Sequence, residues 1–419
     1  MPYVLSITIT AELIIFYYLN NRNILSPSIV SCSLFLLSSL VFAFNQDFFS
    51  YELSPLSIFV ISLLLFFILL GEITVNRIFR FPAKMKVDLK PIYLPNVYCV
   101  FFSIFVFLIG IYYLYDTYTY SISVGNYSGD IWRISQYTRM SNYSKNIILS
   151  QGTLLSECIL FLSFFCYVNN YFCNQISLRY VFPILAYIPH VIACDNRISL
   201  LNIIGVLCII LFSFIKYRVA WSRKKDFQIV MIAILSLISF LFLFRVLGYR
   251  TETSINNELW DNLRNYISSS LIGLDLYLNY GEPENILFGQ SVFFNIYAKL
   301  REWGFDIPLV PHFESFYSYG DFRSSNIYTA LKVYIKDFGY IGGCIGMYIL
   351  SLAVNFSIIS MKYSSFSFYN VVKCGLLFYP IVMISIQDVT ASILSMTMIY
   401  TLIYIKIFDY LIFKRKMDQ

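Results

Sequence analysis

Residues 54–71 read SPLSIFVISLLLFFILLG, and none of these eighteen positions carries a charged side chain. As a helix, a run of this length spans about 27 Å, close to the roughly 30 Å hydrocarbon core of a bilayer. The run also lacks the strict apolar and polar alternation of a membrane barrel strand. It therefore predicts a transmembrane α-helix.

The rest of the chain repeats this pattern. Hydrophobic residues make up 58% of the sequence and charged residues only 13%, which lies far outside the composition of soluble domains. We expect an all-α polytopic membrane protein with about eleven transmembrane helices, within a range of ten to twelve. The predicted spans are 3–19, 24–44, 54–71, 94–115, 147–168, 179–194, 198–215, 227–245, 338–360, 368–386 and 389–411.

Basic residues in the short connections predict the orientation of these spans. Alternating the spans brings the basic segments 77–90, 216–225 and 414–416 to one face, which the positive-inside rule makes cytoplasmic. The net charge of +6 is thus explained without nucleic acid. The loop 116–146 and the long insertion 246–337 then lie on the outer face. Chemistry on the outer face cannot use cytoplasmic nucleotide sugars directly. It requires a lipid-carried substrate that has already been flipped across the membrane.

The insertion divides the chain into three parts. Residues 1–245 contain eight predicted spans, residues 246–337 form one large outer loop, and residues 338–419 contain three spans and a basic tail. The loop mixes acidic, basic and aromatic residues. A channel or carrier needs little outside its spans, whereas a membrane enzyme with a polar, sugar-sized substrate needs such a vestibule.

The loop has predictable secondary structure. Apolar residues recur at helical spacing over 256–279, which predicts an amphipathic helix that lies on the membrane or covers the vestibule. Prolines and glycines make 283–322 loop-like. A second helix is expected to begin near Asn326, run to Asp337 and hinge at Gly339 before the next span.

One histidine in this loop is a candidate general base. His312 lies two residues before Glu314, between Pro311 and an aromatic run. A histidine that titrates near neutral pH and is oriented by a carboxylate can accept a proton, and Glu314 can also act as the base itself. A loop histidine bonded to backbone is the plainer interpretation. His190 follows a proline inside an apolar span, and we expect it to pack or bond within the helices.

Cationic side chains on the outer face are candidates for binding pyrophosphate. Arg323 precedes the second predicted helix, where free backbone N–H groups and the helix dipole favour an anion. Arg197 lies at the outer edge of a span, where charges are functional or paired. The alternative for each is pairing with a nearby aspartate. The full set is Arg197, Arg323, Lys332, Lys336, Arg250, Arg264, Arg133 and Arg139.

Aromatic and amide side chains near these cations are candidates for stacking on, or bonding to, sugar rings. As individuals they equally fit core or interfacial positions. The set is Asn326, Tyr328, Tyr317, Tyr319 and Trp260.

The positions of the cysteines and of two acidic residues bear on two other classes of protein, metal- or disulfide-containing proteins and proton-coupled carriers. Of nine cysteines, seven fall in apolar segments, and no cysteine–histidine spacing outside the membrane matches a metal site, so we expect no metal, cofactor or disulfide. Glu12 and Glu157 fall in mid-span, where a proton-coupled carrier would also place acids.

Three short segments carry a family resemblance. Asn326-Ile-Tyr-Thr together with Asp337-Phe-Gly-Tyr-Ile-Gly resembles the segment that closes the large periplasmic loop of the O-antigen polymerase family (Wzy type), the oligosaccharide repeat-unit polymerases. The segment 266–275, YISSSLIGLD, is similar to the start of that loop. Asn196-Arg197-Ile-Ser resembles the family's arginine at the outer edge of a middle span.

The resemblance implies a multi-pass glycosyltransferase of the bacterial inner membrane, with a GT-C-like fold and a periplasmic active site. Such an enzyme polymerises undecaprenyl-pyrophosphate-linked oligosaccharide repeat units into O-antigen or a related surface polysaccharide without a metal. Its implied partners are these lipid-linked substrates, membrane lipid and a chain-length regulator protein.

Two other functions stay open. An O-antigen ligase shares nearly every feature and differs in its acceptor, which is the lipid A core. A lipid-linked oligosaccharide flippase is expected to lack a long outer loop and to place charge inside its spans.

Overall fold

The computed structural model describes residues 3–20, 22–79, 90–127, 129, 134, 137–138, 143–194, 197–217, 227–228, 231, 255–281, 286–308, 315–320, 323–364 and 366–414. These residues are mostly helical, and the strands among them form one antiparallel hairpin. Among the described residues, seven helices are long and apolar enough to cross a membrane. The chain is therefore a helical, multi-pass membrane protein.

The apolar helices follow most of the predicted spans. The seven long ones are Pro27–Phe44, Pro55–Ile78, Asn96–Ser123, Ile147–Phe172, Ser199–Lys216, Ala330–Lys362 and Met396–Phe413. Three shorter ones are Val4–Leu19, Leu178–Ala193 and Phe368–Met383. The predicted span 227–245 lies outside the described residues apart from three positions. The predicted span 389–411 is interrupted, because the helix stops at Ile393 and resumes at Met396.

Two compact units make up the chain. The first comprises Met1–Pro82, Ser254–Ile359 and Leu377–Met398, and the second comprises Ala83–Thr253, Ser360–Leu376 and Ile399–Gln419. The elements of the first unit are α1 (Val4–Leu19), α2 (Pro27–Phe44), α3 (Gln46–Phe49), α4 (Pro55–Ile78), α12 (Ile255–Tyr280), α13 (Phe294–Glu302), β1 (Tyr317–Tyr319), β2 (Arg323–Ser325), α14 (Ala330–Ile359) and α16 (Thr390–Ile393). Helix α15 (Phe368–Met383) and helix α17 (Met396–Asp409) have residues in both units.

Serine–proline pairs begin two helices of the first unit. Ser26 and Ser54 are the N-caps of α2 and α4, and each side chain accepts a hydrogen bond from the backbone N–H three residues on. The following proline occupies the first helical position, where its missing N–H has no partner to lose.

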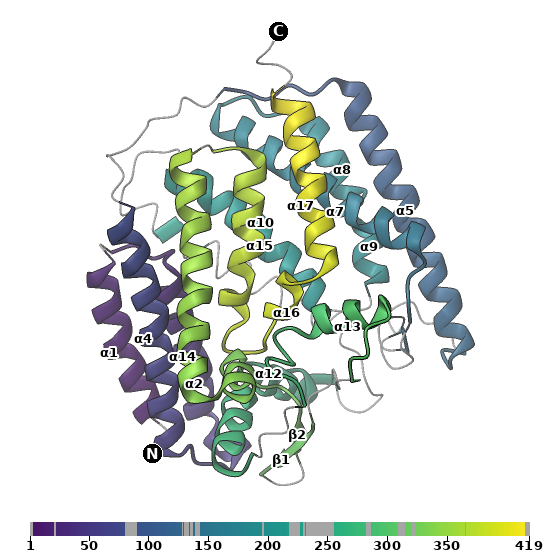
Figure 1. Ribbon diagram of the computed structural model, residues 1–419. Coiled ribbons are helices and arrows are strands. Elements are labelled where there is room, and N and C mark those ends of the chain that lie inside the picture. The colour runs from purple at the N-terminus through teal and green to yellow at the C-terminus, as the bar shows by residue number, and fades with distance from the viewer. Residues whose placement is uncertain are drawn as a thin grey trace. The chain divides into compact units, whose positions relative to one another are not determined.

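Small residues let α4 and α14 pack closely along their length (Figure 1). A Cβ on Gly71 would lie 2.8 Å from the backbone oxygen of Tyr348. Ser351 Oγ donates to Ile68 O at 2.5 Å across the same seam. Close backbone approach of this kind is a main source of helix association in a membrane, where lipid offers no hydrophobic drive.

The hinge predicted at Gly339 is confirmed. Gly339 has φ 71° and ψ −178°, a conformation that only glycine adopts readily, and it divides α14. The part before the break folds against the part after it, since a Cβ on Gly346 would meet the Tyr334 ring at 2.3 Å. The part after the break, 340–359, is about 30 Å long and by itself matches a bilayer core.

The long insertion is more ordered than its sequence indicates. The amphipathic helix expected over 256–279 is confirmed as α12. The expectation that 283–322 is a loop is wrong in part, because it contains α13 and β1. The second helix begins at Ala330 rather than near Asn326. The preceding residues are held by side chains instead, since Ile327 O accepts from Tyr317 and Ile327 N donates to Ser325 Oγ.

The second unit is formed by α5 (Asn96–Ser123), α7 (Ile147–Phe172), the 3-10 turn Leu178–Tyr180, α8 (Val181–Leu185), α9 (Ile188–Ala193), α10 (Arg197–Tyr217), two π-helical turns at Ser360–Ser364 and Tyr410–Lys414, and parts of α15 and α17. Pro183 and Pro189 lie where the short apolar segment breaks into separate helices. His190 is buried, its Nε2 lies 3.1 Å from Val106 O, and its ring stacks on Tyr187 at 4.5 Å. The packing role expected for His190 is confirmed.

Candidate functional site

Three consecutive serines on α12 connect the insertion to three other elements. Ser268 Oγ donates to Ser38 O on α2 at 2.8 Å, and Ser270 Oγ donates to Ser385 O after α15 at 2.6 Å. Ser269 Oγ lies 3.0 Å from Ser325 Oγ on β2. Successive helical residues point about 100° apart, so one short segment bonds in three directions. The insertion is thus packed on the helices of the first unit.

Asp275 fastens the other end of α12. Its buried carboxylate accepts hydrogen bonds from Tyr51 OH at 2.6 Å, from Ser54 N at 2.9 Å and Ser54 Oγ at 2.5 Å, and from Ser57 Oγ at 2.6 Å. These donors lie at and just before the N-terminus of α4, where the helix dipole also favours a negative charge. Asp275 therefore has a structural role.

The tyrosines predicted to contact sugar lie together against α12. Tyr317 OH donates to Ser269 O at 2.6 Å and to Ile327 O at 2.8 Å, and its ring lies 5.0 Å from that of Tyr328. Tyr328 OH donates to Ser315 O at 3.0 Å, and Tyr319 OH donates to Asn265 Oδ1 at 2.7 Å. All three hydroxyl groups thus bond within the protein, and those of Tyr317 and Tyr319 hold the hairpin on α12.

The other two predicted sugar contacts are more accessible. Trp260 on α12 is 52% exposed, and its ring centroid lies 5.8 Å from the Arg264 guanidinium carbon. Asn326 is partly buried between β2 and α14.

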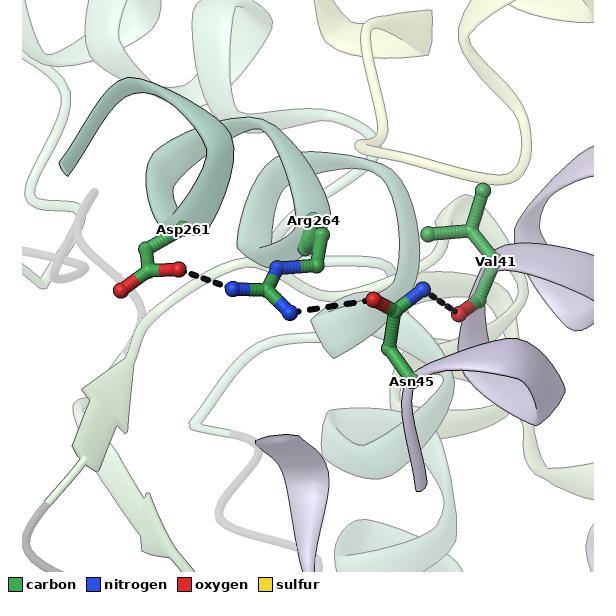
Figure 2. A network of polar contacts seen from close by, with 4 residues as sticks. All are labelled: Val41, Asn45, Asp261 and Arg264. Atoms are coloured by element: carbon green, nitrogen blue, oxygen red, sulfur yellow. Dashed lines mark hydrogen bonds and ion pairs between the residues drawn. The ribbon is translucent and has the colours of Figure 1, made fainter. Parts of the chain in front are cut away.

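Arg264 joins α12 to the C-terminal end of α2, as Figure 2 shows. Its Nη1 donates to Asn45 Oδ1 at 3.0 Å, its Nη2 pairs with Asp261, and its guanidinium lies 4.1 Å from the centroid of the Phe48 ring. Asn45 in turn donates to Val41 O at 2.8 Å. This predicted pyrophosphate ligand is therefore already engaged inside the protein.

Lys332 lies at the start of α14 and is buried. Its Nζ is 3.2 Å from the centroid of the Tyr328 ring and 5.5 Å from that of Tyr277. A cation over aromatic faces keeps favourable electrostatic contact after it leaves water. Lys336, one turn further on, is only partly buried.

The remaining predicted residues are described only in part. Arg197 begins α10 and Arg323 begins β2, but their side chains are outside the description. The rest lie outside the described residues altogether: His312, Glu314, Arg133, Arg139 and Arg250.

Two aspartates that are not among the predicted site residues lie in the first unit, Asp337 on α14 and Asp388 just before α16. Asp337 Oδ2 accepts from Ser291 N and Val292 N, both at 2.8 Å, while its buried Oδ1 has no hydrogen-bond partner among the described residues. Asp388 Oδ1 accepts from Thr390 N at 3.1 Å and from Thr390 Oγ1 at 2.6 Å. Asp337 thus bonds α14 to the segment just before α13, and Asp388 bonds the first residue of α16.

Tyr334 links α14, the helix that carries Asp337, to Thr390, the residue that donates to Asp388. It lies one turn before Asp337 on α14, and its OH donates to Thr390 Oγ1 at 2.9 Å. We call Tyr334, Asp337, Asp388 and Thr390 the carboxylate cluster. The only sequence signal for Asp388 is a lone acid in the short link between two apolar runs, at 387–388.

The surroundings of Asp388 favour its protonated form more than water does. Loss of water on partial burial raises the pKa of the Asp388 carboxyl to about 6, hydrogen bonds from Thr390 oppose the rise, and the negative charge of Asp337 adds to it. Asp388 keeps some exposure. A carboxylate with a pKa near 6 is ionised at neutral pH, yet it accepts a proton more readily than an ordinary aspartate.

The chain matches no family model, no curated protein and no solved structure. Within the described ranges, no three His, Cys, Asp or Glu side chains gather as metal ligands would.

Proposed function

We propose that this chain is a glycosyltransferase that polymerises lipid-linked oligosaccharide repeat units on the periplasmic face of the bacterial inner membrane. In this proposal it is an O-antigen polymerase with about eleven spans and a GT-C-like fold. The lipid carrier is undecaprenyl pyrophosphate, and a chain-length regulator is a further partner.

The observation that carries the proposal is the carboxylate cluster, because it offers a proton acceptor beside the segments that resemble the polymerase family. Asp337 belongs to one of those segments, and the serines of α12 belong to another. Both segments lie in one unit, and they pack closely, since a Cβ on Gly273 would lie 2.9 Å from Ile327 O. A lipid-linked sugar is the kind of substrate that needs a polar site joined directly to membrane helices.

The proposed reaction is one glycosyl transfer. The acceptor hydroxyl oxygen forms a bond to the anomeric carbon of the donor chain, and the bond from that carbon to the pyrophosphate oxygen breaks. The hydroxyl proton passes to a base, and lipid pyrophosphate leaves with the bonding electron pair. One positioned base contributes about 10²–10⁴-fold in rate.

The residues are proposed for three roles. Asp388 is the structural candidate for the base, while His312 and Glu314 remain the sequence candidates. Arg197 and Arg323 are proposed to hold the donor and acceptor pyrophosphates, with Lys332 and Lys336 adding positive potential. Lysine is expected to replace either arginine poorly, because an ammonium group cannot reproduce a bidentate guanidinium contact.

Deleting the gene and examining lipopolysaccharide on a gel tests the proposal. Loss of a polymerase leaves the core with one repeat unit. Bare core instead identifies a ligase when the lipid-linked units reach the periplasm, and a flippase when they stay inside. Complementation with Arg323→Ala and Arg197→Ala should fail to restore long chains although the protein inserts normally.

A further inference from the structure

Residues 286–305 expose several large apolar side chains although they lie outside the long apolar helices. Helix α13 within this segment buries none of its residues. Five large apolar side chains of the segment are exposed: Ile286 (62%), Phe288 (73%), Ile296 (39%), Trp303 (63%) and Phe305 (58%). Exposed apolar side chains gathered in one segment outside a span are typical of a surface that contacts a partner or a membrane.

The composition of α13 and its C-terminal flank fits an interfacial helix. Ile296, Leu300 and Trp303 follow the i, i+4, i+7 spacing that aligns side chains on one face. Tryptophan is enriched where the bilayer meets water. Basic residues beside such a stripe are typical of helices that lie in the headgroup region.

The start of α13 is held at the end of a membrane span. Asp337 accepts from the backbone of Ser291 and Val292 at 2.8 Å. Phe338 packs against Phe288 and Phe293, with ring centroids 5.1 Å and 6.0 Å apart. Asp337 and Phe338 are the last two residues before the break at Gly339. Since the part of α14 beyond the break is about as long as a bilayer core is thick, these contacts hold α13 at the level where the core ends.

A second contact ties α13 to the same level. Asn295 Nδ2 donates to Ala391 O on α16 at 2.6 Å, and α16 is followed within a few residues by the span that begins at Met396. The helix is therefore fixed at the end of two membrane segments, and its position does not depend on its own apolar face.

Charge indicates what covers the exposed face. Lys299 Nζ is paired with Glu302 at 2.5 Å. Arg301 is exposed and lines a shallow hollow with Phe294, Tyr297, Ala298 and Pro308. We propose that α13 lies in the membrane interface, with Ile296, Leu300 and Trp303 in lipid and Arg301 among the phosphates of anionic phospholipids.

The interfacial position of α13 does not depend on the proposed transferase activity. Contact with lipid also explains why a membrane protein leaves a helix of this composition uncovered. It also sets the carboxylate cluster, which shares Asp337 with this anchor, at the height of lipid headgroups.

The test uses the full chain in nanodiscs that contain lipids brominated near the headgroup end of the acyl chain. One variant keeps only Trp303, and a matched variant keeps only Trp260, with the other tryptophans changed to phenylalanine. Trp260 is likewise about half exposed but lies on α12. We expect the bromolipid to quench Trp303 at least about twofold more than Trp260. Equal quenching of the two would overturn the proposal.

The unmodified protein gives a second measurement in case those variants fold poorly. Hydroxyl-radical footprinting read by mass spectrometry should show Trp303 and Phe305 protected in nanodiscs, and Trp260 labelled. Protection should increase when phosphatidylglycerol replaces part of the phosphatidylcholine, and Arg301→Gln should remove that increase. Full labelling of Trp303 and Phe305 in nanodiscs contradicts the proposal. Protection that appears only when two copies share a nanodisc also contradicts it, because the occupant would then be a second chain.

Discussion

Two buried aspartates in the same unit have very different surroundings. Asp275 places both carboxylate oxygens in hydrogen bonds, with donors from Tyr51, Ser54 and Ser57 at the start of α4. Asp337 uses one oxygen for two backbone N–H groups, and its other oxygen is buried with no partner in the described part of the chain. A second carboxylate, that of Asp388, lies close enough for the two charges to oppose each other.

The difference separates a carboxylate whose charge is fully compensated by donors from one whose charge is compensated only in part. A buried charge is tolerated when donors replace the water it has lost, as they do around Asp275. An oxygen without a donor, beside a second acid, favours proton binding instead. The following substitutions test this division, beginning with the largest expected effect.

Removing the Asp275 carboxylate should cost the most stability. Asp275→Ala leaves the hydroxyls of Tyr51, Ser54 and Ser57 without their acceptor, and we expect roughly 3–5 kcal/mol of destabilisation, since each stranded donor costs about 1–3 kcal/mol. Thermal unfolding in detergent, followed by fluorescence, measures the loss. Asp275→Asn should lie between wild type and alanine, and an alanine variant with unchanged unfolding would refute the structural assignment.

The destabilisation caused by substituting Asp337 should depend on whether the new side chain keeps an acceptor oxygen. Asp337→Ala removes the acceptor of two backbone N–H groups, and we expect about 1–3 kcal/mol of destabilisation. Asp337→Asn keeps an oxygen for those groups and should be nearly as stable as wild type in the same unfolding assay. If Asp337→Asn were as destabilising as Asp337→Ala, the second carboxylate oxygen of Asp337 would have to make a stabilising hydrogen bond, and the contrast with Asp275 would be wrong.

Asp388 should show a pH dependence. Its folded pKa of about 6 lies above the ordinary 3.8, so the folded protein binds this proton more tightly than the unfolded chain does. Ionisation therefore destabilises the fold above pH 6, and this cost disappears as the pH falls toward 4. Asp388→Asn should be more stable than wild type at pH 7.5 by about 1 kcal/mol, less than the full pKa shift implies, because the side chain keeps some contact with water.

The same variant tests the proposed base. In a purified assay with lipid-linked repeat units extracted from the deletion strain, wild-type activity should fall as pH drops through 6 if Asp388 is the base. Asp388→Asn should be slower by about 10²-fold or more and should lack this limb of the pH profile. A fast variant with the wild-type profile returns the role to His312 or Glu314, whose substitution by alanine or glutamine follows next.

The smallest effect is expected from Tyr334→Phe. It removes one hydrogen bond to Thr390 and keeps the ring that packs against Gly346, so we expect about 0.5–1.5 kcal/mol of destabilisation. Thr390→Val removes the same bond from the other side. The double variant should cost less than the sum of the two, and additive losses in this cycle would show that the bond is not formed.

Local signals in the sequence predicted much of the fold. Uninterrupted apolar runs such as 54–71 locate membrane helices because each must satisfy its own backbone in lipid. The helical spacing over 256–279 located α12. The glycine at 339 located the break in α14, because that residue type tolerates a conformation that others avoid.

Long-range contacts account for what the sequence did not predict. The strand residues 317–319 and 323–325 carry no strong strand pattern, and β1 is held by Tyr317, whose partners are Ser269 O on α12 and Ile327 O. In the sequence, Asp388 has only the features of a loop residue. In the fold, Thr390 donates to Asp388, and Tyr334 donates to Thr390. The engagement of Arg264 by Asn45, more than two hundred residues earlier, is equally invisible in a local pattern.

The bonds of Asp275 also impose a waiting time during synthesis. Tyr51 and Asp275 are 224 residues apart in the chain. At about 5–20 residues per second, the ribosome needs roughly 11–45 s to make the residues between them. Throughout that interval the start of α4 is already in the membrane while its acceptor does not yet exist. The hydroxyl groups at the start of α4 must bond to water or to lipid headgroups until α12 has been made and Asp275 replaces those partners.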